Sequence, residues 1–524
     1  MRQVLAGVLV VAAAQICFAQ APTSAPLSPY EAPDLALPET PLDKLVAASW
    51  AKHNITPAHP TTDAVFLRRV YLDVIGTLPT AKEARAFLED KRPNKRQLLI
   101  DELLARDEYA MYWSMKWADL LRVKAEFPIN LWPNAVQAYH HWIFESLQKN
   151  KPVDTFAREL LTASGSNFRS PPANFYRAVQ AKDEKGIAQA VALTFMASRL
   201  EKWPAEDQAN FVKFFSAVGF KSTAEWKEEI VFFDAAKVGE GGTQATLPDG
   251  TKVKLTAERD PRVVFTDWLL AKDNPRFAEA IANRAWFWLM GRGIVHEPDD
   301  MRRDNPPANP QLLRYLANEL ATSKYDMKAL LRVILNSRTY QLSCVPRTKG
   351  ALAESQFASY PLRRLEAEVL IDAINQITGS TEKYWSPIPE PFSYIPPEQR
   401  SINLADASIS SSFLDLFARS TRDQGTELER NHRPTPAQRL HMLNSSHIQK
   451  KIERSTKLGE LFRSRKEPRE TVRDVYLTIL SREPTRSEMQ VLAKYVEEHK
   501  DTPKENIIDV VWALLNSDEF IYRH

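Results

Sequence analysis

The segment VRDVYLTILSREPTRSE, residues 472–488, repeats the pattern of an earlier segment, LRRVYLDVIGTLPTAKE, residues 67–83. The two segments share residues at identical spacing: Arg68/Arg473, Val70/Val475, Tyr71/Tyr476, Leu72/Leu477, Pro79/Pro484, Thr80/Thr485 and Glu83/Glu488. Threonine and glutamate three positions apart have the spacing of a capping box, in which each side chain accepts a hydrogen bond from the other residue's backbone N–H. Each copy is therefore predicted to form a helix, a turn marked by proline and a second, capped helix.

Helical periodicity extends over most of the chain from about Leu45 onward. The 524 residues include 15 glycines and 35 prolines. Few glycines argue against a hairpin-rich β-fold, and many prolines indicate helices separated by stiff loops. The sequence therefore predicts a mainly α protein, with one helix at LVAASWAKHN (45–54) and four short helices in series over 63–123.

The segment 229–262 interrupts the helical pattern. It holds four of the glycines and three short runs, VFF, TQATL and KVKL, of which the last two flank the turn PDG. Such runs around a turn predict short strands joined by a hairpin. We therefore expect two helical domains, 43–228 and 261–524, with a small β-hairpin insertion, 229–260, between them.

A second element recurs at VILNSRTYQ (333–341), HMLNSSHIQ (441–449) and ALLNSDEFI (513–521). Its common part is an apolar pair followed by Asn and Ser. Short polar side chains of this kind bond to nearby backbone groups and so compete with a continuing helix. We expect each Asn-Ser pair to break or recap a helix, rather than to bind a ligand.

The first residues predict a signal peptide, 1–19, followed by a proline-rich linker, 20–42, that forms an extended tether. Arg2 provides a short positive region and residues 4–14 an apolar one. Cleavage after Ala19 is favoured over cleavage after Ala21, because a proline follows the second bond. A lipoprotein signal at Cys17 is the weaker alternative, since a bulky isoleucine precedes it.

The mature protein is accordingly expected to be exported, to the periplasm or the cell surface. No later stretch has eighteen uninterrupted apolar residues, so no membrane span is expected after signal cleavage. Without Arg2 the chain has 68 basic and 66 acidic residues, a balance that disfavours nucleic acid or an anionic membrane as a partner.

Cys344 is the one cysteine left, which excludes an internal disulfide and a cysteine-based metal or haem site. We expect Cys344 to be buried and inert.

Several motifs resemble two domain families of unknown function. FLRRVYLDVIGTLPT (66–80) and YWSMKWADLLR (112–122) are similar to the start of DUF1549. The run from DPRVVFTDWLL (260–270) through GRG, DD, NPP and NSRTYQ to YPLRRLEAEVLIDAI (360–374) resembles DUF1553. The resemblance covers residue 60 to the C-terminus and implies an exported protein of the planctomycete or verrucomicrobial type, without an established activity.

The chain departs from the family pattern at one place. Many relatives carry a CxxCH-like run between the end of an apolar helix and a tryptophan, but the corresponding segment here, 192–220, has neither Cys nor His in residues 196–203. Covalent attachment of c-type haem needs both thiols and the axial histidine. No cofactor is therefore expected.

The strongest candidate for a functional site lies in NRAWFWLMGRGIVHEPDDMRRDNPPANP, residues 283–310. The glycines of GRG are expected to end a helix, and Asn309 to cap the next one. The chemistry would come from Arg284, Asp299, Asp300, Arg303 and Asn305: a carboxylate for acid catalysis or a metal, and an arginine for an anion. The alternative, which we favour, is that these acids and arginines pair with one another.

A second polar segment, 413–438, contributes Arg419 and Arg422, which we expect to flank the same cleft. Trp113 and Trp117 are four positions apart and are expected in the core, whereas Trp286 and Trp288 cannot share a helix face, so one of them is expected to face a groove or the other domain. A carbohydrate platform formed by the tryptophans is the alternative to packing.

Of the adjacent histidines His140 and His141, one should be buried and the other solvated. The chain has no HExxH motif, zinc finger or nucleophile–His–Asp signature, so no metal is expected.

Three functions remain open on this basis. The first is a non-catalytic binding or scaffold component of the cell envelope, with other exported envelope proteins or a glycan as partner. The second is a hydrolase of exported polysaccharide that uses an Asp/Arg cleft. The third, a redox-associated partner of a cytochrome, rests on the family resemblance alone. The missing catalytic signatures favour the first.

Overall fold

The computed structural model describes residues 28–463 and 467–524 and confirms a mainly α protein. The predicted signal peptide lies outside these residues. The first half contains α2 (Pro41–Lys52), α3 (Asp63–Val74), α4 (Ala81–Glu89), α5 (Lys95–Ala105), α6 (Asp107–Leu120), α7 (Pro133–Gln148), α8 (Val153–Leu161), α9 (Asn174–Arg177), α10 (Glu184–Met196) and α11 (Ala205–Val212). The helix predicted at 45–54 and the four predicted over 63–123 are thus present, the four as α3 to α6.

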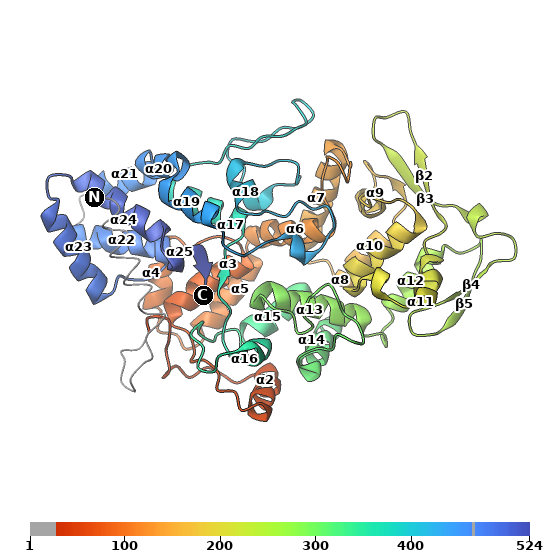
Figure 1. Ribbon diagram of the computed structural model, residues 1–524, viewed down its shortest axis with the longest axis horizontal. Helices are drawn as coiled ribbons and strands as arrows, with labels where there is room; N and C mark the ends of the chain where they lie inside the picture. Colours follow the sequence, from red (N-terminus) through yellow and green to blue (C-terminus); the bar gives the residue numbers. More distant parts are fainter. Residues whose placement is uncertain (1–27, 464–466) are drawn as a thin grey trace.

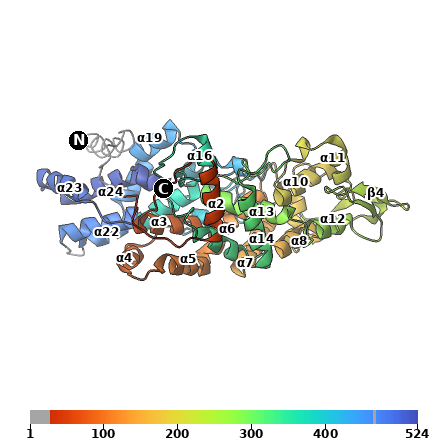
Figure 2. The same ribbon diagram turned by 90° about the horizontal axis from the view of Figure 1, so that it is seen from below.

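The second half is also helical. It contains α12 (Pro261–Leu269), α13 (Arg276–Met290), α14 (Pro310–Thr322), α15 (Met327–Leu335), α16 (Ala351–Ser355), α17 (Ala367–Thr378), α18 (Ser412–Leu416), α19 (Pro436–Asn444), α20 (Ser446–Glu453), α21 (Thr456–Arg463), α22 (Pro468–Leu480), α23 (Arg486–Glu498), α24 (Pro503–Leu515) and α25 (Asp518–Ile521). Figure 1 shows an elongated body with α22 to α24 at one end, the β2–β5 region at the other, and α6 and α13 between them. The turned view keeps this order (Figure 2).

The strands are short and form three small sheets. They are β1 (Gly165–Ser166), β2 (Val218–Ser222), β3 (Glu229–Phe233), β4 (Thr243–Thr246), β5 (Lys252–Leu255), β6 (Arg363–Arg364) and β7 (Tyr522–Arg523). β4 and β5 form the hairpin predicted around PDG, with Thr246 opposite Lys252. β3, however, pairs with β2 and β1, which lie in the segment expected to be helical. The β region therefore extends beyond the predicted 229–260, because β3 finds its partners earlier in the chain.

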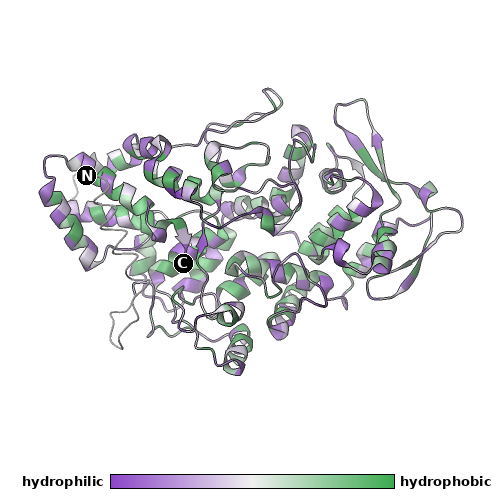
Figure 3. Cartoon of the chain, viewed as in Figure 1, coloured by the Kyte–Doolittle hydropathy of each residue, from purple (hydrophilic) through white to green (hydrophobic). Residues whose placement is uncertain are grey.

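A single hydrophobic cluster runs from Leu42 to Ile521 and contains nearly all of the buried apolar side chains. Hydrophobic and hydrophilic residues alternate around the helices, as expected of amphipathic elements packed on a shared core (Figure 3). The division into domains 43–228 and 261–524 stays a prediction, because both ranges contribute to this one core.

The repeated segments fold as predicted. α3 is followed by α4 and α22 by α23, and both second helices begin with a capping box, Thr80/Glu83 and Thr485/Glu488. The two copies also contact each other: α22 packs against α4, and Arg85 of α4 forms a 2.6 Å ion pair with Asp474 of α22. The repetition therefore places two similar helix pairs side by side in one core.

Buried arginines connect the N-terminal helices to the C-terminal end of the chain. Arg68 donates hydrogen bonds to the carbonyl oxygens of Ile479 (2.7 Å) and Phe520 (2.9 Å). Arg69 donates to the carbonyl oxygen of His524, the last residue (2.9 Å). The C-terminus consequently lies inside the body, beside α3 and α25, rather than at one of its ends (Figure 1).

The Asn-Ser elements have the structural role predicted for them. Asn336 is the C-cap of α15, and Asn444 is the last residue of α19. Asn516 is the C-cap of α24, and Ser517 then caps α25 through a hydrogen bond from the Phe520 N–H.

The described part of the linker, 28–40, differs from the expected tether. It lies against the body, where the Ala32 N–H donates to the Pro60 carbonyl oxygen (2.8 Å) and Thr61 donates to that of Tyr30 (3.0 Å). This segment is held because its backbone groups pair with those of residues 60–62.

Candidate functional site

The loop between α13 and α14, residues 291–309, forms as the sequence predicts. α13 ends at Gly291, which has a positive φ of 68°. A side chain there would collide with Arg363, because its Cβ would lie 2.3 Å from the arginine Cδ. At the other end, the Asn309 side chain accepts the Leu312 N–H and caps α14. The Met301 N–H donates to the Ala197 carbonyl oxygen (2.8 Å) and so holds the loop against the end of α10.

Asp299 and Asp300, adjacent in this loop, point to different surroundings. Asp299 is fully buried, and it accepts hydrogen bonds from Arg284 (3.0 Å) and from the Glu427 N–H (2.8 Å). Asp300 forms ion pairs with Lys202 (2.7 Å) and Arg302 (2.8 Å). Burial opposes the ionisation of Asp300, but the bonds from these two cations outweigh it and lower its pKa. The two carboxylates therefore do not form a pair.

The outer side of the loop borders a groove of about 860 Å³, which we call the α13–α14 groove. Arg303 and Asn305 lie in its wall. The other walls come from α10 to α11, the β4–β5 turn and the two helices. Its charged residues are Lys202, Arg276, Arg302, Arg303 and Arg314 against Asp207, Glu279 and Asp304, and its apolar ones include Met196, Trp203, Phe211 and Leu313. The groove thus combines apolar surface with an excess of cationic side chains.

The cations of this groove differ in how they are engaged. Lys202 and Arg302 neutralise Asp300. Arg303 and Arg314, in contrast, form no ion pair with any residue that the structure describes, and both are exposed. An arginine of this kind retains all its N–H donors for a ligand.

Two family models match the chain. One is described as Protein of unknown function (DUF1549) and matches residues 41–217, and the other as Protein of unknown function (DUF1553) and matches residues 261–496. The chain thus carries a DUF1549 match followed by a DUF1553 match. Comparisons with curated proteins and with solved structures found no match. The β2–β5 region lies at the junction between the two matched ranges.

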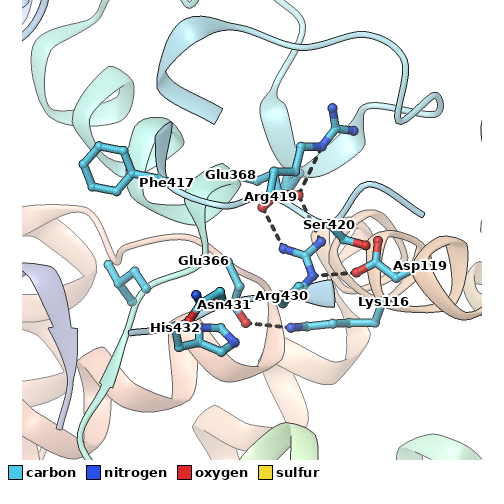
Figure 4. Close-up of polar contacts among 12 residues, drawn as sticks. Lys116, Asp119, Glu366, Glu368, Phe417, Arg419, Ser420, Arg430, Asn431 and His432 are labelled. Carbon is cyan, nitrogen blue, oxygen red and sulfur yellow. Dashed lines mark hydrogen bonds and ion pairs between the residues drawn. The ribbon is translucent and has the colours of Figure 1, made fainter. Parts of the chain in front are cut away.

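Arg419 and Arg422 do not line the α13–α14 groove but lie in the interior, where the DUF1549 and DUF1553 ranges meet. Arg422 pairs with Asp119 of α6 (2.9 Å), and Arg419 with Glu368 of α17 (3.3 Å). Arg430 lies between the two acids and pairs with both, at 2.5 Å from Asp119 and 2.8 Å from Glu368 (Figure 4). The expectation that these arginines flank an open cleft is therefore wrong, because buried carboxylates of two helices bind them inside the core.

A second set of buried charges adjoins the first. Glu366 pairs with Lys116 of α6 (2.6 Å) and with Arg523 of β7 (2.5 Å). Burial disfavours the carboxylate, but the positive charge of Arg523 and Lys116 outweighs it and holds the pKa of Glu366 well below its usual value. In the same way Arg430 and Arg419 lower the pKa of Glu368 to about 2. Removing one member of such a network leaves its partner charged and buried, which is costly.

The segment 413–438 does reach the 299–305 loop, as predicted, but through Glu427. Its Oε1 accepts a hydrogen bond from Trp288 Nε1 (2.6 Å), and its N–H donates to Asp299. Burial, together with the negative charge of Asp299, raises the pKa of Glu427 to about 7. Glu427 is half-buried and does not line the α13–α14 groove.

The tryptophans and histidines can be placed directly. Trp113 and Trp117 lie in the core as predicted, and Trp286 and Trp288 are both buried. Trp288 packs against Trp113 and Trp117 of α6, with ring centroids 5.4 and 6.0 Å apart, so it faces the range 43–228 rather than a groove. His140 is buried, whereas His141 is exposed. Cys344 is half-buried rather than buried.

Residues 28–463 and 467–524 contain neither a metal-binding cluster nor a membrane-spanning helix. No group of three or more His, Cys, Asp or Glu residues is arranged to hold a metal ion there. Nor is any described helix long and apolar enough to cross a membrane.

Proposed function

We propose that the protein is an exported, non-catalytic binding component of the cell envelope and that the α13–α14 groove holds an anionic ligand. Export is supported by the N-terminal sequence, with its single arginine and the apolar run 4–14. Binding without turnover is supported by the carboxylates of the 291–309 loop, which are paired with cations of the protein.

One observation carries this proposal. All four carboxylates of the 291–309 loop are bound by cations of the protein itself: Glu297 by Arg199, Asp299 by Arg284, Asp300 by Lys202 and Arg302, and Asp304 by Arg302. The oxygens of a carboxylate held in this way are engaged by the protein itself rather than by a substrate. Three arginines that line the same groove, Arg276, Arg303 and Arg314, form no ion pair with a described residue and would attract an anion.

The shape of the site favours a glycan over a flat protein surface. A concave space of about 860 Å³ has the size of small-ligand and oligomer sites. The apolar side chains Trp203 and Leu313 would contact sugar rings, and the arginines would bind carboxylate or sulfate groups. An acidic segment of an exported polysaccharide combines both features.

Calorimetric titration of the mature protein would test the proposal. We expect binding of carboxylated or sulfated oligosaccharides, weakened by salt, and at least about tenfold weaker binding in Arg303→Glu/Arg314→Glu, a loss of about 1.4 kcal/mol. Lys450→Glu/Arg454→Glu, at the C-terminal end of α20, makes the same change in net charge outside the groove and should bind normally. Equal losses in both double variants, or binding of an envelope protein in place of any glycan, would contradict the proposal.

A hydrolase is the second candidate, and Glu427 favours it. A carboxyl group with a pKa of about 7 is suited to general acid catalysis. Hydrolysis of a polysaccharide that is abolished by Glu427→Gln, but retained in Asp304→Asn, would replace the binding role by a catalytic one.

A further inference from the structure

A second groove, of about 570 Å³, lies between α7 and the segment that follows α17. Gln137, His140, His141 and Phe144 line it from α7, at spacings that place them on one side of the helix. The opposite wall is formed by residues 391–409 and includes Phe392 and Tyr394. We call this space the α7 groove.

Two aromatic rings stand at the edge of the α7 groove. Phe392 is 57% exposed and Tyr394 is 67% exposed, whereas large aromatic side chains normally bury most of their surface. The Phe392 ring is held by Trp132, with ring centroids 5.7 Å apart. Five prolines within residues 386–397 restrict the backbone that carries both rings. The rings are thus presented in a restricted conformation, which lowers the entropy lost on binding.

The polar lining of the α7 groove has unused hydrogen-bonding capacity and little free charge. The side-chain amides of Gln137 and Asn403 make no hydrogen bond with a described residue. His140 is 7% exposed, and its Nε2 has no hydrogen-bond partner. Burial lowers the pKa of His140 to about 3, so that it is neutral at pH 7. Asp406 is engaged inside the wall, where it accepts the N–H groups of Ala125 and Ser408.

We propose that the α7 groove binds a neutral polysaccharide chain. The rings of Phe392 and Tyr394 would lie against the apolar C–H faces of sugar rings, and Gln137, Asn403 and His140 would exchange hydrogen bonds with hydroxyl groups. A hydroxyl is both donor and acceptor, as are an amide and a neutral imidazole. An apolar peptide or a lipid would leave these polar groups without partners, which disfavours binding.

This site is independent of the α13–α14 groove, since the two share no lining residue. They also differ in charge: the α13–α14 groove has exposed arginines, whereas the α7 groove has none in its lining. The two sites would therefore recognise neutral and acidic glycans separately.

The test uses the mature full chain and neutral hexasaccharides of β-linked glucose, xylose and mannose as probes. We expect at least one of them to bind, with at least about tenfold weaker binding in Tyr394→Ala and in Phe392→Ala. Both residues are exposed, so the variants should fold normally. Trp226→Ala removes an equally exposed aromatic ring, 69% accessible, outside the groove and should bind as the parent does.

Gln137→Ala/Asn403→Ala tests hydroxyl recognition and should also weaken binding, because a purely apolar contact would not need the amides. Arg303→Glu/Arg314→Glu should leave the neutral hexasaccharides unaffected, which separates this site from the acidic one. Three results would overturn the proposal. One is no binding of any neutral hexasaccharide at about 5 mM, above the range of weak specific binding. The others are an equal loss in Tyr394→Ala and Trp226→Ala, and unchanged binding in the amide double variant.

Discussion

The helix pairs α3–α4 and α22–α23 share their sequence pattern but not their surroundings. In α3 all residues from Val65 to Val74 are buried, whereas in α22 seven residues are buried and the others are half-buried or exposed. The arginine common to both copies shows the difference. Arg68 is buried and donates to two backbone carbonyl groups, while Arg473 is half exposed and pairs with Glu483 at the surface. One pattern therefore serves both a central helix and a peripheral one.

Each copy nevertheless builds the same cluster around its second helix. An arginine lies over the buried tyrosine ring and pairs with the capping glutamate: Arg106, Tyr71 and Glu83 in the first copy, and Arg482, Tyr476 and Glu488 in the second. The repeated segment contains the tyrosine and the glutamate in both copies. The first arginine comes from the end of α5, and the second from the turn itself. The residues shared by the two copies thus specify two members of the cluster, whereas the third comes from outside the repeat in the first copy and from an unshared position of the repeat in the second.

The turn between the helices also has the same backbone in both copies. Gly76 and Ser481 occupy equivalent positions, and both have a positive φ, 61° and 59°. A Cβ on Gly76 would lie 2.4 Å from the ring of Tyr112. Ser481 has room for its side chain, but its hydroxyl oxygen is buried without a hydrogen-bond partner. The turn therefore requires glycine in the first copy and merely tolerates serine in the second.

Gly76→Ala should have the largest effect. The new methyl group meets Tyr112 and forces an L-residue into the left-handed region, so we expect a loss of about 3 kcal/mol in the free energy of unfolding. Ser481→Gly should act in the opposite direction, with a gain of up to about 1 kcal/mol, because it relieves the same backbone strain and removes the unpaired hydroxyl. Urea unfolding followed by circular dichroism measures both. A loss in Gly76→Ala no larger than the gain in Ser481→Gly would show that backbone strain alone, and not Tyr112, sets the requirement.

The second-largest effect on stability concerns Arg68 and Arg473, which occupy equivalent positions in the two copies. Arg68→Met should lower the free energy of unfolding by about 2 kcal/mol, because it leaves the carbonyl oxygens of Ile479 and Phe520 buried without partners. Part of the loss is offset, since a buried charge is removed as well. Arg473→Met should change stability by less than about 0.5 kcal/mol, as expected for an exposed ion pair. Equal losses in the two variants would show that the surroundings do not distinguish the copies.

Features set by residues close in sequence were predictable, and those set by distant residues were not. The capping boxes, the helix end at Gly291 and the β4–β5 hairpin involve bonds across a few positions, which leave a pattern in the sequence. The ion pair between Lys116 and Glu366 spans 250 positions. Its only trace is the presence of charged residues within the apolar runs YWSMKWADLL and LEAEVLIDAI. Charges at such positions were the signal that could have revealed the buried network.

The candidate site likewise combines features set by neighbouring residues, which were predictable, with features set by distant residues, which were not. The sequence identified the 291–309 loop and its ends, because caps and glycines are local. It did not show that Asp299 and Asp300 point to different surroundings, since Arg284, Lys202 and Glu427, which are distant in sequence, determine the direction of each carboxylate. Arg419 and Arg422 were assigned to a cleft because exposed and buried arginines look alike in sequence when their acidic partners lie on other helices.

The smallest effect concerns the capping glutamates and depends on pH. Burial disfavours ionisation of both, but hydrogen bonds from Thr80 and Arg106 outweigh it for Glu83, and those from Arg482 and Thr485 do so for Glu488, so that the pKa of each lies below its usual value of 4.5. As the pH falls, each glutamate is therefore protonated at a higher pH in the unfolded state than in the folded state. Each glutamate stabilises the fold fully above pH 4.5, and this contribution is lost as the pH falls through the folded-state pKa.

Glu83→Gln and Glu488→Gln should each cost about 1 kcal/mol or less at pH 7, and the difference from the parent protein should shrink below pH 4.5. The side chain of Glu488 is less exposed than that of Glu83, 21% against 33%, and Arg482 binds both of its oxygens. We therefore expect the larger loss in Glu488→Gln. Unfolding curves between pH 3 and 7 would measure this order. A larger loss in Glu83→Gln would mean that the more central position of the first copy, rather than the geometry of its arginine, sets the strength of the cap.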